Sequence, residues 1–95
     1  MKITNETSKT VEISYYGKKA IIEARKSLDI AFERIGDFII VRSEEGEASI
    51  YRGFDSRTVT EIGNLKASNG KLLMEVIIHN WFAFTFYPPH AEVIR

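Results

Sequence analysis

The sequence predicts an all-β fold: a small antiparallel β-sandwich, or a partly open barrel, of about eight short strands. Three observations support this prediction. Apolar residues recur with a period of two along much of the 95 residues. Turns rich in Gly, Asn and Ser separate these segments at intervals of roughly 8 to 12 residues. The sequence has no long stretch with the 3.6-residue period of a helix, so we expect a single β domain spanning residues 1–95.

The alternating pattern in the first third of the chain predicts short strands around Ile3 and at 10–16, 19–24 and 27–33. Polar or glycine-containing turns separate them at 5–9, 17–18 and 25–26. The last of these strands shows the clearest alternation, because Leu28, Ile30 and Phe32 fall on the face opposite Asp29 and Glu33. Such a pattern is typical of a strand with one face in the core and one in solvent.

The middle of the chain begins with an unbroken apolar run at 38–41, which predicts a strand covered on both faces. A turn at 44–46 and a returning segment at 48–52 predict a hairpin, with Ile50 and Tyr51 on opposite sides.

The next segment, 53–69, allows two interpretations. Asp55 could cap a short helix with Val59 and Ile62 on one side, but the β-branched residues 58–60 favour a strand, because they lose rotamer freedom in a helix. Asn69-Gly70 then predicts a turn.

The longest alternating stretch runs from Lys71 to Tyr87. Its even positions form a predicted core row: Leu72, Met74, Val76, Ile78, Asn80, Phe82, Phe84 and Phe86. A straight strand of this length would reach about 50 Å, whereas a domain of this size has a radius of gyration of about 12 Å. We therefore expect one strand bent at His79-Asn80, or two collinear strands, and we disfavour a tight hairpin at that point. Pro88-Pro89 ends the stretch, and 91–94 forms either a short edge strand or a frayed end.

The alternation resembles that of immunoglobulin-like and jelly-roll modules, but alternation alone carries the resemblance. Charges balance at 13 basic and 13 acidic residues, which argues against a dedicated nucleic-acid binder. The interleaved aromatic and basic residues of 15–26 are the one feature that favours nucleic acid. With no cysteine, no export signal and no membrane span in the sequence, we expect a cytoplasmic protein.

The sequence nominates no catalytic residue, no metal ligand and no cofactor. Glu75 and His79 share a face of the predicted strand but lie about 13 Å apart at the standard rise, so they cannot hold one ion together, and His90 has no partner at ligand spacing. The serines lie mainly in turns or on polar strand faces, without a nucleophile elbow. An enzyme whose site the sequence does not show is the last of three hypotheses; the other two are the binding modules described next.

The candidate binding surface is the side of the C-terminal stretch that carries Trp81, Thr85 and Tyr87, with His79 at the bend. Side chains with an apolar body and a polar tip are enriched at protein interfaces. We therefore predict a non-enzymatic module that works by protein–protein interaction or by self-association as a dimer. The alternative is a carbohydrate-like ligand stacked on Trp81 and Tyr87.

Overall fold

A computed structural model describes residues 1–53, 58–62, 65–70, 72–80, 83–89 and 91–94. These residues contain strands and no helix, which confirms the all-β prediction. The strands are β1 (Lys2–Asn5), β2 (Val11–Tyr15), β3 (Lys18–Ile22), β4 (Ser27–Asp29), β5 (Phe38–Ser43), β6 (Gly46–Arg52), β7 (Thr58–Ile62), β8 (Leu65–Asn69), β9 (Glu75–Asn80), β10 (Ala83–Tyr87) and β11 (Ala91–Ile94). Within this part of the chain, no helix is long and apolar enough to cross a membrane.

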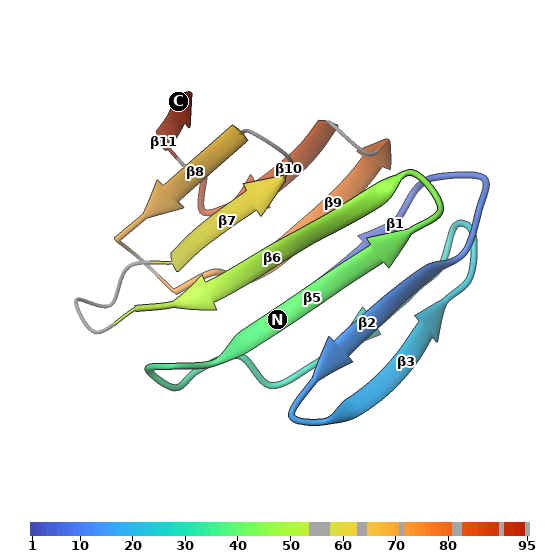
Figure 1. Ribbon diagram of the computed structural model, residues 1–95, viewed down its shortest axis with the longest axis horizontal. Coiled ribbons are helices and arrows are strands. Elements are labelled where there is room, and N and C mark those ends of the chain that lie inside the picture. The colour runs from blue at the N-terminus through green and yellow to red at the C-terminus, as the bar shows by residue number, and fades with distance from the viewer. Residues whose placement is uncertain (54–57, 63–64, 71, 81–82, 90, 95) are drawn as a thin grey trace.

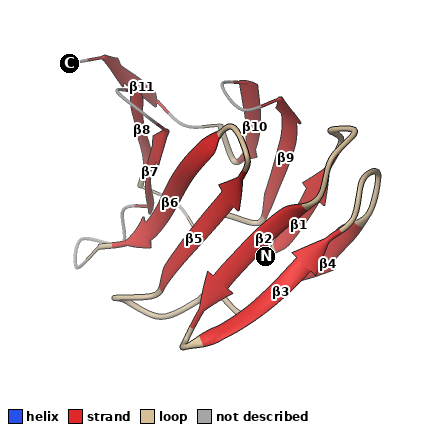
Figure 2. Cartoon of the chain, turned by 45° about the vertical axis from the view of Figure 1, so that its right-hand side comes forward, coloured by secondary structure: helices blue, strands red, loops and turns tan. Residues whose placement is uncertain are grey.

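The strands form two sheets that pack as a small β-sandwich. A four-stranded sheet has the order β10-β9-β1-β4, and a seven-stranded sheet has the order β11-β8-β7-β6-β5-β2-β3. Figures 1 and 2 show the larger sheet in front, with β9 and β10 behind it. Neighbouring strands are antiparallel except β1 and β9, which run parallel.

The core lies between the two sheets and follows the period-two pattern. Val11 and Ile13 of β2 and Val76 and Ile78 of β9 belong to one buried cluster that draws on both sheets, and each has at most 1% of its surface exposed. Burying an aliphatic side chain of this size contributes roughly 1.5–3 kcal/mol. The inward alternation of short strands therefore supplies most of the driving force for this fold.

The stretch 71–87 contradicts the prediction of one bent strand. β9 and β10 form an antiparallel pair, so the chain reverses between Asn80 and Ala83. The register contains a bulge: Asn80 lies opposite Ala83, but Ile78 lies opposite Phe84, which leaves His79 without a counterpart. This extra residue keeps the apolar rows of β9 and β10 on the same face. A regular turn at 79–80, without the bulge, would instead place Glu75 on the same face as the phenylalanines.

The predicted core row also fails before β9 begins. Leu73 is only 1% exposed, whereas Leu72 and Met74 are 38% and 69% exposed. Residues 72–74 are not part of a strand. Their backbone is held instead by two hydrogen bonds at Met74, whose N–H donates to the Tyr87 carbonyl and whose carbonyl accepts from the Lys2 N–H. The alternation of a regular strand therefore starts only at Glu75.

Two further predictions need correction. The run 38–41 is covered on one face only, since Phe38 is 43% exposed and Ile40 is half-buried, whereas Ile39 and Val41 are buried. The strand predicted at 27–33 ends at Asp29, because its partner β1 begins at Lys2, which pairs with Asp29. The predicted burial of Ile30 and Phe32 is nevertheless correct.

Two predictions are confirmed: residues 38–52 form the β5–β6 hairpin, and 58–62 form a strand. Of the two alternatives for 91–94, the structure has the edge strand, which pairs with β8. The helix cap proposed at Asp55 lies outside the described residues. The turn predicted at Gly17-Lys18 lies one residue earlier, where Tyr16 and Gly17 both have positive φ, as a primed hairpin turn requires.

Candidate functional site

The outer face of the four-stranded sheet carries a row of three hydroxyl residues and one isoleucine. The register aligns four residues across the strands in the order Thr85, Ile77, Thr4 and Ser27. The hydroxyls of Thr4 and Ser27 form a hydrogen bond of 3.0 Å. Hydroxyl groups from two separate strand pairs therefore share one solvent-facing surface.

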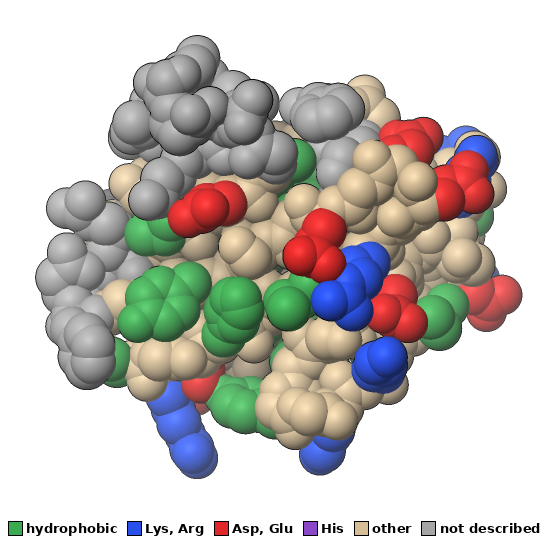
Figure 3. Space-filling view, viewed as in Figure 1, with side chains coloured by type: hydrophobic (Ala, Val, Ile, Leu, Met, Phe, Trp, Pro, Cys, Tyr) green, Lys and Arg blue, Asp and Glu red, His purple; other side chains and the backbone are tan. Residues whose placement is uncertain are grey.

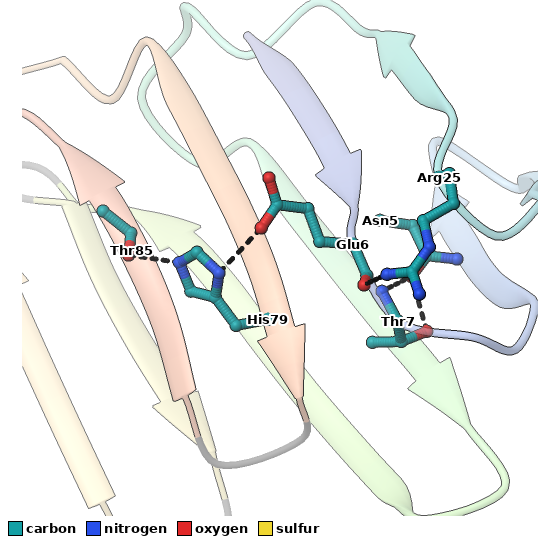
Figure 4. A network of polar contacts seen from close by, with 6 residues as sticks. All are labelled: Asn5, Glu6, Thr7, Arg25, His79 and Thr85. Carbon is teal, nitrogen blue, oxygen red and sulfur yellow. Dashed lines mark hydrogen bonds and ion pairs between the residues drawn. The ribbon is translucent and has the colours of Figure 1, made fainter.

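His79 connects two distant segments on this face, as Figure 4 shows. Its Nδ1 lies 2.8 Å from Glu6 Oε1, and its Nε2 lies 2.7 Å from Thr85 Oγ1. A carboxylate can only accept, so Nδ1 carries a hydrogen and donates to Glu6. In the neutral imidazole Nε2 then accepts a hydrogen bond, and the Thr85 hydroxyl donates it. The result is a continuous carboxylate–imidazole–hydroxyl chain.

The position of His79 follows from the bulge in β9. An extra residue in one strand of an antiparallel pair kinks that strand and redirects a side chain. His79 is that residue, and its ring reaches sideways to Thr85 on the neighbouring strand. Glu6 reaches the ring from the other side because its N–H donates to the Ile78 carbonyl at 2.9 Å.

Asn5 fixes the segment that carries Glu6. Asn5 is fully buried, and its side-chain amide donates to the carbonyls of Lys9 and Ile22 at 2.7 and 3.0 Å. Its Oδ1 accepts from the N–H and the hydroxyl of Thr7 at 3.0 and 2.6 Å. Arg25 adds a further anchor, since its guanidinium donates to the Glu6 carbonyl (Figure 4).

A hollow of about 330 Å³ opens beside the side chains of Glu6 and His79, at one end of the sandwich. Its walls come from loops of both sheets: Glu6, Thr7, Ser8, Lys9, Val11, Arg25, Ser43, Glu44, Glu45, His79 and Asn80. Lys9 and Glu44 form an ion pair across it. Cationic and anionic groups are both present, so the hollow suits a small polar molecule. Among the described residues, no three His, Cys, Asp or Glu side chains come together to hold a metal.

The structure brings together two of the four predicted surface residues. His79 contacts Thr85, and Tyr87 is 48% exposed two residues further along β10. Trp81 lies outside the described residues, as does His90. Glu6 was not predicted as part of the site, because it is 73 positions away from His79 and nothing in the local pattern connects the two.

A second exposed surface lies on the outer face of the seven-stranded sheet. Phe38 and Tyr51 are 43% and 37% exposed, and their rings meet edge to face with centroids 6.3 Å apart. Figure 3 shows hydrophobic side chains in a row on this face. This surface was not predicted either, because the apolar run that contains Phe38 indicated a strand covered on both faces.

Asp37 is a buried carboxylate with a structural role. Its Oδ2 accepts from the N–H groups of Glu33 and Arg34, both at 2.8 Å, and its Oδ1 accepts from the Tyr16 hydroxyl. Burial, the largest single influence, raises the pKa of Asp37, but the hydrogen bonds from Tyr16, Arg34 and Glu33 together outweigh it and lower the pKa. The same bond to Asp37 raises the pKa of Tyr16.

Comparisons of the sequence with profiles of known protein families, with curated proteins, and with solved structures give no match. The function must therefore be argued from the geometry of this chain alone.

Proposed function

We propose that the protein is a non-enzymatic β-sandwich module that binds a second copy of itself through the edge of β10. The supporting observation is that β10 is an end strand of the four-stranded sheet and carries no charged residue between Ala83 and Tyr87. Main-chain groups along an edge strand are a template for pairing with another chain.

The other three end strands have the features that normally prevent such pairing. β3 presents Lys18 and Lys19, both exposed. β4 has only three residues and ends in the exposed Asp29, and β11 contains Glu92 in its sequence. Charges and short length are the usual protection of sheet edges, and β10 has neither.

The sequence of β10 suits antiparallel pairing with an identical strand. A two-fold axis at Thr85 places Thr85 opposite its own copy, Phe84 opposite Phe86, and Ala83 opposite Tyr87. Facing residues in an antiparallel pair point to the same side of the sheet, so both phenylalanines of each copy stay on the core side. This register uses all five residues of β10. This pairing joins the four-stranded sheets of the two copies into one continuous sheet. It adds about four to six main-chain hydrogen bonds.

Sedimentation equilibrium at protein concentrations up to about 100 μM tests the proposal. High concentrations are needed because the new hydrogen bonds, worth roughly 1 kcal/mol each, must offset the entropy lost on association. Thr85→Lys and Thr85→Glu are each expected to be folded monomers, because like charges directly opposite one another repel. An equimolar mixture of the two variants is expected to restore the dimer. Thr85→Val is expected to dimerise, because it keeps the shape without adding a charge.

Ile21→Lys is the matched control. Ile21 is 59% exposed on β3, the end strand of the other sheet, and a lysine there is expected to leave the dimer unchanged. A parent protein that stays monomeric at all concentrations would refute the proposal. A dimer that survives both charged variants would place the interface elsewhere.

Binding of a carbohydrate-like ligand is the second candidate, favoured by the exposed ring of Tyr87 beside Thr85 and by the polar hollow. Aromatic faces and neighbouring polar groups form typical ligand surfaces. Calorimetric titration with neutral oligosaccharides tests it, and Tyr87→Ala is expected to abolish any binding. A monomeric parent that binds an oligosaccharide would favour this second candidate over the first.

A further inference from the structure

We propose that Thr85 is a covalent modification site that accepts one acyl group from a small activated acyl donor, such as a thioester or an aryl ester. The geometry is that of a nucleophile, its base and the group that orients the base. Thr85 Oγ1 is 2.7 Å from His79 Nε2, and His79 Nδ1 is 2.8 Å from Glu6 Oε1. Both distances lie within the range of about 2.6–3.2 Å that general-base activation of a hydroxyl requires.

Each group has one role in the transfer. The Thr85 oxygen attacks the carbonyl carbon of the donor, and His79 Nε2 takes the hydroxyl proton. The new C–O bond forms as the C–S or C–O bond to the leaving group breaks. The proton then passes from Nε2 to the leaving thiolate or aryloxide, which restores the neutral imidazole. The reaction uses no oxidant, reductant or second substrate.

Glu6 acts as a positioning residue. Its carboxylate fixes the tautomer in which Nε2 is unprotonated, and it stabilises the imidazolium that forms during the attack. The buried Asn5 holds the segment that carries Glu6, and the bulge at His79 fixes the ring. Thr85 is itself only half-buried, so a donor can reach its hydroxyl from solvent.

The polar hollow does not hold the donor, because it lies on the Glu6 side of the imidazole: Glu6 and His79 line it, whereas Thr85 lies on the opposite side of the ring. The donor therefore reaches the Thr85 hydroxyl directly from solvent.

The test uses p-nitrophenyl acetate and peptide mass mapping of the full chain. We expect acetylation of Thr85 to be at least about 100-fold faster than that of Thr4, a matched threonine on the same face that bonds to Ser27 instead of an imidazole. Thr85→Ser is expected to react and Thr85→Val is not. His79→Ala and His79→Gln are both expected to lower the Thr85 rate by about 10²–10⁴-fold, with folding checked by circular dichroism.

Two Glu6 variants separate a positioning role of this residue from a merely structural one. Glu6→Gln removes the negative charge that stabilises the imidazolium during the attack, so the Thr85 rate is expected to fall while circular dichroism stays that of the parent. Glu6→Asp keeps the carboxylate and is expected to retain more of the rate than Glu6→Gln.

Two results would overturn the proposal: equal acetylation of Thr85 and Thr4, or a Thr85 rate that does not change in His79→Ala. Neither bears on the dimer, which is measured without an acyl donor.

Discussion

Replacing Asn5 with alanine tests whether this side chain is the anchor of the candidate site. The residue is fully buried and takes part in four side-chain hydrogen bonds, two donated to carbonyl groups and two accepted from Thr7. Each such bond contributes about 0.5–1.5 kcal/mol. The bond to the Ile22 carbonyl is buried, and its loss leaves an unsatisfied acceptor at a cost of about 1–3 kcal/mol. The other partners are part-buried and regain water.

Together these contributions predict that Asn5→Ala lowers the free energy of unfolding by about 3–5 kcal/mol, a large fraction of the roughly 5–15 kcal/mol of a typical domain. Urea denaturation followed by circular dichroism measures it. Thr4→Ala is the neighbouring control, since Thr4 makes one exposed hydrogen bond to Ser27, and we expect it to change stability by less than about 1 kcal/mol. A single hydrogen bond contributes on the order of 1 kcal/mol. If the free energies of unfolding of Asn5→Ala and the parent differ by less than about this amount, the anchoring role is refuted.

Three other residues allow similar tests. The lowered pKa of Asp37 means that its ionised form stabilises the folded state above the unfolded pKa of about 3.9, and that this stability is lost as the pH falls through the folded pKa. Asp37→Asn is therefore expected to be less stable than the parent at pH 7, with a difference that narrows below about pH 4 in acid denaturation curves. Phe84 is half-buried and packs against the core, so Phe84→Ala is expected to cost about 1.5–3 kcal/mol, less than the 3–5 kcal/mol typical of a fully buried ring. Met74→Ala, at a side chain 69% exposed, is expected to change stability by at most about 0.5 kcal/mol in the same denaturation assay.

The sequence was sufficient where strands are regular. Val11 and Ile13, or Val76 and Ile78, alternate with residues that are less buried, and alternation reports directly which face meets the core. It was insufficient at His79, because a bulge shifts the pairing by one residue without any mark in the alternation. Leu73 is a second example: outside a strand, position in the sequence no longer determines the face.

The candidate site was only half predictable for a related reason. His79 and Thr85 both occupy odd positions of one alternating stretch, so the period of two placed them on one surface, although the hairpin that brings them into contact was not predicted. Glu6 meets His79 only because β1 lies parallel to β9 in the middle of the smaller sheet. Parallel neighbours are not joined by a short turn, so their pairing depends on the whole topology and not on local sequence. The exposed face of Phe38 was missed for lack of the same information, since a run of apolar residues does not reveal how many layers cover it.

Thr85 is common to both proposals, and this creates a coupling that a single experiment can measure. In the two-fold register Thr85 lies opposite its own copy, where facing side chains have Cβ atoms about 4.5–5.5 Å apart. Two hydroxyls fit in this space, whereas two acetyl esters add bulk on the same face and remove both hydroxyl donors. Acetylated protein is therefore expected to dissociate more readily than unmodified protein, by about tenfold in the dissociation constant for each 1.4 kcal/mol of lost pairing. Sedimentation of the acetylated parent, beside His79→Ala treated with the same ester, measures the effect. Equal association of the acetylated and unmodified parent would show that Thr85 does not lie at the centre of the interface.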